Sequence, residues 1–556
     1  MLRIILRLLI LPLFLGVAIA GEPPAATARE RAVTLSKQGG DFGRQGKLQE
    51  AEKLFRQALV IDPSCALAHN GLGTLLSMQG DVRGAEREYQ KAIELDPKLG
   101  KSYANLSLIL YANGDLDGAI ALLKQGRAKA PEDALVCTAL GIMLGHKRDY
   151  DDSIEMLRQA VTLDPNLSEA WRNLAGMLGA KHDWDGAEEA AGKALALNPR
   201  DPDAYVNLGW PLEEKGDMDR AEKCFREAIK IDGNNAKAHY GLGRVLLVKG
   251  GREAAKVELR RALDIERKNA DFLVVVANML CMIGDHDSAL AAFRRAETLA
   301  PQNAEAHAGI GIALCSKKDY DGAVAELRKA MDIDPALASP HDNLGFLLAE
   351  RGQLAEAEKE WRKAIEVNPK YYHSYENLAA TLSNGKDWAG AEKVLRQGMD
   401  VLPKEPQLSL ALAIMLEAKG DSDRSIAELR KAVQIFPKDR EVNHELGLAF
   451  VRKNDQNEAF RYLKKTVELA PLWAEAHCDL GAVLIASGKN EEAVKVFDQA
   501  LVLDPDMAMA YRGLALAWHW SGNDKEAAAV IERADKRGLG KAIDDGFRAD
   551  VKKSFN

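Results

Sequence analysis

Five asparagines recur at one fixed spacing or its multiples, and their side-chain amides are candidates for ligand binding. Each amide offers both a donor and an acceptor. A row of amides could therefore pair with the backbone of an extended peptide, whatever the side chains of that peptide. The alternative is that asparagine is simply a common residue at this position. The row consists of Asn105, Asn173, Asn207, Asn343 and Asn377.

Large apolar residues stand three positions after the asparagine position in many of the same segments. If they face a groove, the groove is partly apolar, and an exposed apolar strip usually marks a partner site. Packing against a neighbouring helix is the alternative explanation. Trp210 and Phe346 are the two that we place in a candidate peptide-binding surface together with the asparagines. The full set is Leu108, Ile142, Trp210, Ile312, Phe346, Ile414, Leu448 and Leu516.

Histidines share another recurring position and could ligate a metal. Other segments carry Tyr103, Trp171 or Tyr205 there, so histidine replacing a packing aromatic explains the pattern. A metal would need further donors converging on adjacent histidines, and none is visible in the sequence. We therefore expect no metal site and no cofactor. The histidines are His69, His239, His307, His341 and His477.

The six cysteines form no C-x-x-C motif, and their spacing follows the same recurrence. Cys281 and Cys315 occupy equivalent positions of adjacent segments. Their backbones should be about 8–10 Å apart, beyond the roughly 7 Å limit for a disulfide. We expect buried free thiols.

Catalytic and nucleic-acid-binding signatures are lacking. The sequence has no G-x-S-x-G, no HExxH and no phosphate-binding glycine loop. We therefore expect that this protein is not an enzyme. The net charge is −8, and acidic and basic residues interleave without a basic run after Arg7. Nucleic-acid binding would need a continuous positive stripe.

The segment from Ala474 to Pro505 shows which elements carry these residues. His477, Leu480 and Leu484 lie on one face of a helix because they are three to four residues apart. Residues 487–490 end that helix, and a second helix follows. Asp504-Pro505 stops the second helix, since proline cannot donate a backbone hydrogen bond. Two such helices cannot bury their apolar faces alone and need neighbours of the same kind.

That unit repeats along the chain without insertion, always at the spacing that separates Pro471 from Pro505. The terminal proline recurs at Pro63, Pro97, Pro131, Pro165, Pro199, Pro301, Pro335, Pro369, Pro403, Pro437, Pro471 and Pro505. Small residues recur where two helix backbones must approach closely, and a larger side chain there would cost about 1–3 kcal/mol. They are Ala51, Ala85, Ala119, Ala187, Ala221, Ala255, Ala289, Ala323, Ala357, Ala391, Ala459, Ala493 and Ala527, with Ser153 and Ser425.

The pattern of aromatic, Leu-Gly, Ala, aromatic, Ala and Pro at this period resembles the tetratricopeptide repeat (TPR) family. Tyr205-Leu208-Gly209 carries its first part and Phe225-Ala228 its second. The resemblance implies an all-α fold: an α-solenoid that winds as a right-handed superhelix of about 15 helix-turn-helix repeats over residues 32–541. It also implies that the first helix of each repeat lines the concave side.

On that concave side, the asparagine row looks like the ladder in the repeat domain of the O-linked N-acetylglucosamine transferases. The likeness covers only these five units, and the transferase domain is absent. The carboxylate clamp of the co-chaperones in this family has no matching set of residues here, which argues against capture of a C-terminal carboxylate.

The two ends differ from the repeats. Arg3 and Arg7 precede an apolar stretch that closes in Ala18-Ile19-Ala20, the pattern of a secretory signal peptide over residues 1–20. We expect a periplasmic or secreted protein; an uncleaved anchor would instead hold it at the inner membrane facing the periplasm. Residues 21–31 form a linker. Residues 542–556 form a C-terminal capping helix.

The middle of the array departs from the pattern. Pro211 falls inside a first helix, and Gly233 and Arg267 replace two terminal prolines. With the extra flexibility of Gly250-Gly251, we expect a bend or softer joint over residues 210–276.

Three functions fit this sequence. The first is a non-catalytic scaffold outside the cytoplasm that binds a protein or an extended peptide along its concave groove. The second is an accessory or spacer subunit of an envelope machine that exports polysaccharide or assembles pili. The third is a substrate adaptor for a separate glycosyltransferase. The oligomeric state stays open, and membrane contact is expected only if residues 1–20 are retained.

Overall fold

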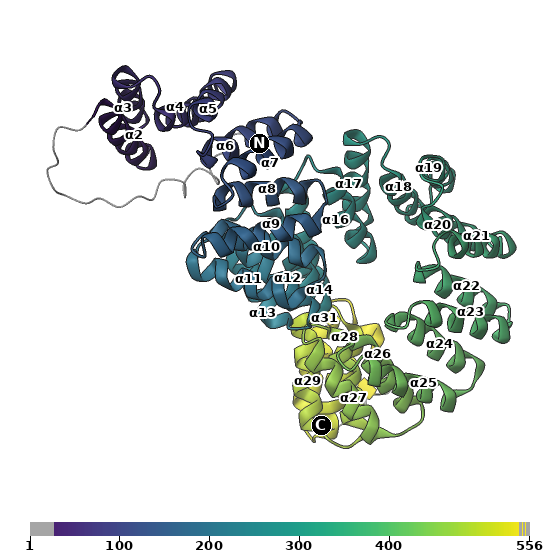
Figure 1. Ribbon diagram of the computed structural model, residues 1–556. Helices are drawn as coiled ribbons and strands as arrows, with labels where there is room; N and C mark the ends of the chain where they lie inside the picture. The colour runs from purple at the N-terminus through teal and green to yellow at the C-terminus, as the bar shows by residue number, and fades with distance from the viewer. Residues whose placement is uncertain (1–26, 544–546, 549–550, 552–556) are drawn as a thin grey trace. The chain divides into compact units, whose positions relative to one another are not determined.

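The computed structural model describes residues 27–543, 547–548 and 551, which are helical throughout with short turns between helices (Figure 1). They form fifteen helix pairs with no strand among them, so the chain is an all-α solenoid. The predicted signal peptide, most of the linker and part of the capping segment lie outside the described residues. None of the described helices is both long and apolar enough to span a bilayer.

The chain forms two compact units, residues 1–215 and 216–556, and the boundary lies between the two helices of the sixth repeat. It falls inside the region where the sequence predicts a joint. The first helices of unit 1 are α2 (Ala28–Arg44), α4 (Ala66–Gln79), α6 (Gly100–Ala112), α8 (Ala134–His146), α10 (Ser168–Ala180) and α12 (Pro202–Glu214). Its second helices are α3 (Leu48–Ile61), α5 (Val82–Leu95), α7 (Leu116–Lys129), α9 (Tyr150–Leu163) and α11 (Trp184–Leu197).

Unit 2 begins with α13 (Met218–Ile231) and continues with the same alternation. Its first helices are α14 (Ala236–Val248), α16 (Ala270–Met282), α18 (Ala304–Ser316), α20 (Ala338–Glu350), α22 (Tyr372–Asn384), α24 (Pro406–Lys419), α26 (Arg440–Arg452), α28 (Ala474–Ala486) and α30 (Ala508–Trp520). Its later second helices are α15 (Arg252–Ile265), α17 (His286–Leu299), α19 (Tyr320–Ile333), α21 (Leu354–Val367), α23 (Trp388–Val401), α25 (Ser422–Ile435), α27 (Gln456–Leu469), α29 (Asn490–Leu503) and α31 (Asp524–Lys536), followed by the short η2 (Gly540–Ala542).

The turn inside each repeat uses the same backbone conformation at the equivalent position. One residue per turn has a positive φ, and in ten of the fifteen repeats it is glycine, which adopts this conformation without strain. The other five carry Arg148, His182, Lys318, Lys386 and Asn454. In most repeats an aspartate then caps the second helix; the Asp81 carboxylate, for example, accepts a hydrogen bond from the backbone N–H of Gly84.

The recurring small residues lie where the sequence places them, at the contact between paired helices. All thirteen alanines are fully buried. Ser153 and Ser425 fit as well because their hydroxyls donate to the carbonyls of Gly141 (2.6 Å) and Ala413 (2.9 Å) on the paired helix. The contact leaves no spare room, because a Cβ added to Gly311 on α18 would lie 2.6 Å from the Leu327 side chain on the paired helix α19.

The two replaced prolines and Pro211 disturb the helices less than expected. α13 and α15 still end at Ile231 and Ile265 although Gly233 and Arg267 stand in place of proline. α12 continues through the buried Pro211 to Glu214. The repeated packing therefore decides where these helices end.

Unit 2 is closed by a contact between segments that lie far apart in the sequence. The Arg440 guanidinium donates to the carbonyls of Leu247 (2.8 Å) and Val248 (2.7 Å) at the end of α14. The backbone N–H of Leu472 donates to the Lys249 carbonyl (2.8 Å). Carbonyls at a helix C-terminus lack hydrogen-bond donors within the helix and carry partial negative charge. An arginine supplies both the donors and the opposite charge.

This contact corrects the expected flexibility of the glycine pair. Gly250 and Gly251 lie directly against Trp473 and Leu472, and Gly250 has a φ of +92°. The glycines therefore serve a close approach and do not loosen the joint.

We predict that Gly250→Ala destabilises the chain more than Gly284→Ala, the same turn position of the next repeat. Both residues have positive φ, so both variants share the backbone strain. A Cβ at Gly250 would lie 2.5 Å from the Trp473 backbone, whereas nothing lies within 4 Å of one at Gly284. The expected difference in unfolding free energy is about 1–3 kcal/mol. Urea unfolding of the intact chain measures it, and equal losses would contradict the closing contact.

Candidate functional site

The first helices lie on the inner side of each unit. In unit 2 each first helix from α16 to α26 packs against the next first helix, whereas second helices of neighbouring repeats make no comparable contact among the described residues. In a curved stack of two layers, the more closely spaced layer lies inside the curve. Figure 1 shows α18, α20, α22 and α24 along that inner side. Residues exposed on first helices therefore form the candidate binding surface, which we call the inner face.

The asparagine row bridges neighbouring first helices. The Nδ2 of Asn207 donates to the Arg172 carbonyl (2.9 Å), and that of Asn343 to the Ala308 carbonyl (3.5 Å). The Nδ2 of Asn173 instead donates to the backbone carbonyl of Glu169 in its own helix (2.8 Å). These bonds show that the row helps to stack the repeats. That it also binds a peptide backbone stays a prediction.

The remaining two asparagines belong to matched three-residue groups, one in each unit. In unit 1 the Asn70 Oδ1 accepts from the Ser102 hydroxyl (3.1 Å) and from the amide of Asn105 (3.2 Å). In unit 2 the equivalent acceptor is the Asp342 carboxylate, which is bonded by Ser374 (2.8 Å) and Asn377 (3.2 Å). Asp342 is 5% exposed, and burial raises its pKa above the ordinary value for aspartate.

The apolar residues at the next recurring position divide into two classes. Six of the eight are half-buried, among them Trp210 in unit 1. Phe346 on α20 and Ile414 on α24 are 41% and 55% exposed. Unit 2 therefore offers the more open apolar surface of the inner face.

Four of the five recurring histidines pair with a glutamate that follows at one constant spacing, a partner that our sequence analysis missed. The Nδ1 of His69 lies 2.6 Å from Glu88, and that of His307 lies 2.7 Å from Glu326. His239 and His341 pair with Glu258 and Glu360 in the same way. The sequence carried the signal, because a glutamate stands at this spacing after each of the four paired histidines. His477, which makes no such pair, has Val496 there instead.

Further donors do converge on one histidine, contrary to the expectation from sequence. The Oε1 of Glu297 lies 4.0 Å from the Nδ1 of His307, so His307, Glu326 and Glu297 could together hold a metal ion. However, the other ring nitrogen of His307 bonds the Pro301 carbonyl (3.0 Å), and Glu326 also pairs with Lys329 (3.0 Å). Both ring nitrogens of His307 therefore already have hydrogen-bonding partners within the protein. The same pair forms at His239, where the residue equivalent to Glu297 is Ile229.

All six cysteines are free thiols. Four are buried as expected, and Cys281 and Cys478 are half-buried. Burial raises the pKa of Cys281 to about 11 and that of Cys478 to about 12, which makes both poor nucleophiles at neutral pH.

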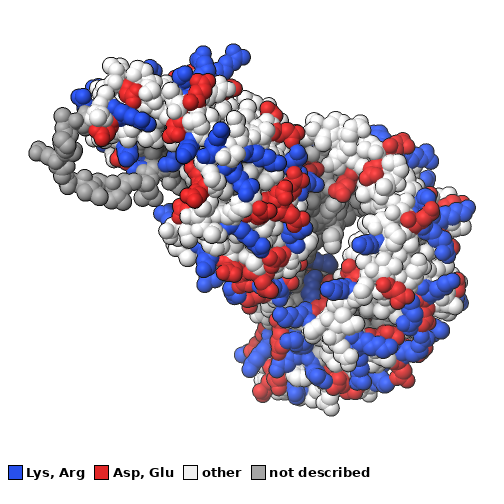
Figure 2. Space-filling view, in the orientation of Figure 1, with Lys and Arg blue, Asp and Glu red and all other residues white. Residues whose placement is uncertain are grey.

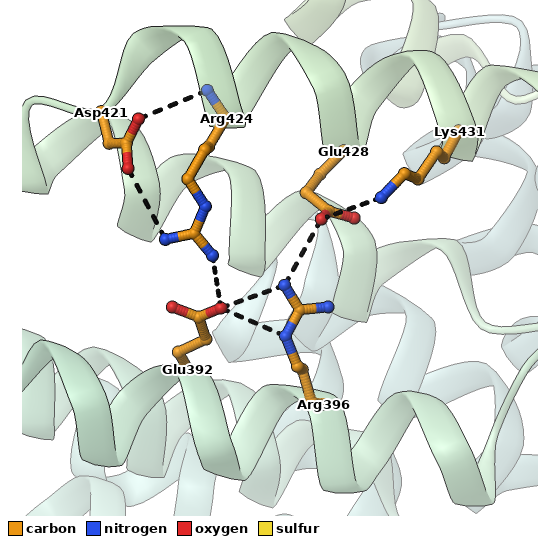
Figure 3. A network of polar contacts seen from close by, with 6 residues as sticks. All are labelled: Glu392, Arg396, Asp421, Arg424, Glu428 and Lys431. Atoms are coloured by element: carbon orange, nitrogen blue, oxygen red, sulfur yellow. Dashed lines mark hydrogen bonds and ion pairs between the residues drawn. The ribbon is translucent and has the colours of Figure 1, made fainter.

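Charge is sorted between the two layers of unit 2, although sequence analysis found it interleaved. Second helices pair their charges across repeats: on α23 and α25, Arg424 contacts Glu392 (2.6 Å) and Arg396 contacts Glu428 (3.4 Å) (Figure 3). Both signs mix over the surface seen in Figure 2. The seven first helices from α16 to α28, by contrast, carry ten acidic and three basic residues.

Family models match most of the array. The model described as the C-terminal domain of cilia and flagella-associated protein 70 matches residues 64–273. Two tetratricopeptide repeat models match residues 282–338, 384–440 and 478–540, and residues 338–363. The chain belongs to the tetratricopeptide repeat family. The TPR fold is that of a protein-interaction scaffold.

The solved structures that resemble this chain include several TPR proteins. Cut9 in the Cut9–Hcn1 complex is 17% identical over 88% of this chain and 96% of its own, with a TM-score of 0.45. Yeast Tom70 is 17% identical over 76% and 96%, with a TM-score of 0.40. YrrB, titled a TPR protein with an unusual peptide-binding site, is 27% identical over 34% and 97%, with a TM-score of 0.28. No curated protein matches the chain.

We predict that Asp342→Asn stabilises this TPR chain increasingly as pH rises. Because its pKa is raised, folded Asp342 holds its proton more tightly than the unfolded chain does, so wild-type stability falls as pH rises above the ordinary aspartate range. Asparagine keeps an acceptor for Ser374 and carries no charge. The expected gain at pH 7.5 is on the order of 1 kcal/mol and vanishes near pH 3.

The reciprocal variant Asn70→Asp is the control, because Asn70 has the same two kinds of partner. It should lose stability over the same pH range in which Asp342→Asn gains it. Thermal unfolding midpoints between pH 3 and 8 measure both. Stability changes of the same sign in the two variants would contradict the conclusion that the buried Asp342 charge destabilises the folded chain.

Proposed function

We propose that this TPR protein is a non-catalytic scaffold that holds a protein partner, in extended form, along the inner face of unit 2. The observation that carries the proposal is the exposure of Phe346 and Ile414 on first helices that otherwise pack closely together. Large apolar side chains exposed on a concave surface are typical of partner sites. The asparagine row, including Asn343 and Asn377 beside these residues, would supply polar contacts to the partner's backbone.

A second candidate, a spacer subunit of an envelope assembly machine, is favoured by a different observation. Second helices also expose apolar side chains: Val257 on α15 is 64% exposed and Val502 on α29 is 72% exposed. A spacer docked through outer surfaces would use these residues. The third candidate, an adaptor for a glycosyltransferase, rests only on the asparagine row.

Cross-linking from defined positions separates the first two candidates. A photo-crosslinking amino acid at Phe346 or Ile414 should capture discrete partner proteins in the producing cell, and one at Val257 or Val502 should not. Alanine at Asn343 and Asn377 should then weaken capture from Ile414 if the amides bind the partner. Capture confined to the Val257 and Val502 positions would replace the scaffold proposal with the spacer.

We also propose that the array works outside the cytoplasm. Support comes from the charged start, the short apolar stretch and the Ala18-Ile19-Ala20 exit of residues 1–20. Residues 1–31 fused to a reporter that is active only after export should give activity in a bacterial host. Exchange of Leu8, Leu9 and Ile10 for aspartate should abolish it, because a signal peptide needs an apolar core. Unchanged activity after that exchange, or none before it, would overturn the proposal.

A further inference from the structure

Acidic residues of the inner face of unit 2 gather on the helices from α16 to α28. Ten acidic against three basic residues on α16 to α28 give a difference of seven, whereas the first helices at the two ends of unit 2, α14 and α30, carry three basic residues and no acidic one. The first helices α4 to α12 of unit 1 carry four acidic and two basic residues, and three of those four acidic residues are on α12. The acidic charge on α16 to α28 is therefore not a general feature of the first helices, because α14 and α30 are basic and α4 to α10 are nearly neutral.

Among the described residues, most of these carboxylates have no lysine or arginine partner. Seven of the ten make no ion pair with a lysine or an arginine of the described residues. Asp342, Glu350 and Glu376 are among these seven. The basic side chain that Glu376 contacts is that of His373, at 3.6 Å. On the outer layer, Glu392 and Glu428 each contact two basic side chains. Unpaired negative charge on a partly buried surface is unfavourable to the free chain and leaves the charge available to a ligand.

Around the middle of this surface, neighbouring carboxylates raise the pKa of nearby acidic groups. Burial raises the pKa of Glu405, which precedes α24, and the nearby carboxylates of Glu376 and Asp439 add to the effect, while His373 opposes it. Burial also raises the pKa of Tyr372, and Glu376, Glu405 and Glu441 contribute further. A bound cation would relieve this crowding.

Two further features of the same helices concern a ligand directly. The Oε1 of Gln407 on α24 is a buried acceptor without a hydrogen-bond donor among the described residues. Phe346 and Ile414 are exposed on α20 and α24, the helices on either side of Glu376. The surface therefore combines a buried acceptor, negative charge without basic partners in the described part of the chain, and apolar side chains.

We propose that the inner face of unit 2 from α20 to α26 binds an extended protein segment that carries lysine or arginine at about every third residue, with apolar residues between them. The spacing follows from the fold: neighbouring first helices lie about 8–10 Å apart, and an extended chain rises about 3.3 Å per residue. One cationic side chain would meet Glu350 on α20, the next Glu376 on α22 and the third Glu405 before α24. The apolar residues would contact Phe346 and Ile414. Nucleic acid would be repelled by the same charge.

This inference rests on the proposed function and names the chemistry of the partner. The probe is a synthetic 15-residue peptide with lysine at every third position and leucine and serine between. Three control peptides keep its length: one with glutamate in place of lysine, one with glutamine in place of lysine, and one with all its lysines gathered at one end. Binding to the full chain is measured by fluorescence anisotropy at two salt concentrations.

The variant D342N/E376Q/E405Q should bind the spaced-lysine peptide about tenfold more weakly, with a smaller salt dependence. The control variant D321N/E356Q/E491Q removes the same charge from exposed positions of α19, α21 and α29, and it should bind as the wild type does. Equal weakening by both variants would show general attraction to an acidic protein and overturn the proposal. Circular dichroism melts confirm that both variants are folded.

The peptide controls separate this inference from the proposed function. If the glutamine peptide binds as tightly as the lysine peptide and binding is lost in F346S/I414S, the inner face is a partner site but its charge does not select the partner. If none of the peptides binds, both proposals fail for this surface. If the gathered lysines bind as tightly as the spaced ones, the spacing is refuted.

Discussion

The structure depends on the close approach of the two helices in each repeat. Fully buried alanines at the crossing point let the backbones come together, and a glycine or a tolerated substitute with positive φ makes the turn between them short. Two helices of this size expose too much apolar surface to be stable alone, so each pair must stack on its neighbours. The same contact accepts Ser153 and Ser425 because their hydroxyls find carbonyl acceptors. It tolerates small polar groups but not added volume.

Stacking creates two layers with different roles. The outer second helices of unit 2 neutralise their charges in networks that cross repeat boundaries, such as the one that joins α23 and α25. Such exposed pairs contribute little free energy each, but they match acidic with basic side chains across the repeat boundary. The inner first helices keep acidic groups that lack such partners among the described residues. In a scaffold, unpaired charge and exposed apolar surface on one layer distinguish a binding surface from a merely solvated one.

Unit 2 adds a constraint that no single repeat contains. Arg440 and Leu472 bond the C-terminal end of α14 across the many repeats between them, and Gly250 gives the space that the contact requires. Because the curvature of a solenoid sums small rotations from repeat to repeat, a bond between distant repeats limits how far the unit can open. The inner face from α20 to α26 belongs to the repeats that this contact encloses, so its width is held by more than local stacking.

The sequence by itself determined the repeat: its constant period, the helix ends at Asp504 and its equivalents, the buried alanines and the all-α solenoid. Each of these follows from interactions within a repeat or with the next one, so local pattern suffices. The partners of His69 and His307 were also available to pattern, as a glutamate at one constant spacing. The surroundings of Glu297 and His307, the bonds of the asparagines to the preceding repeat and the closing contact at Gly250 were decided only by the tertiary structure. These depend on how the repeats pack and curve, and curvature accumulates from side-chain packing that a periodic sequence does not show. For the same reason, the acidic groups of unit 2 could be recognised as one surface only after the first helices were placed side by side.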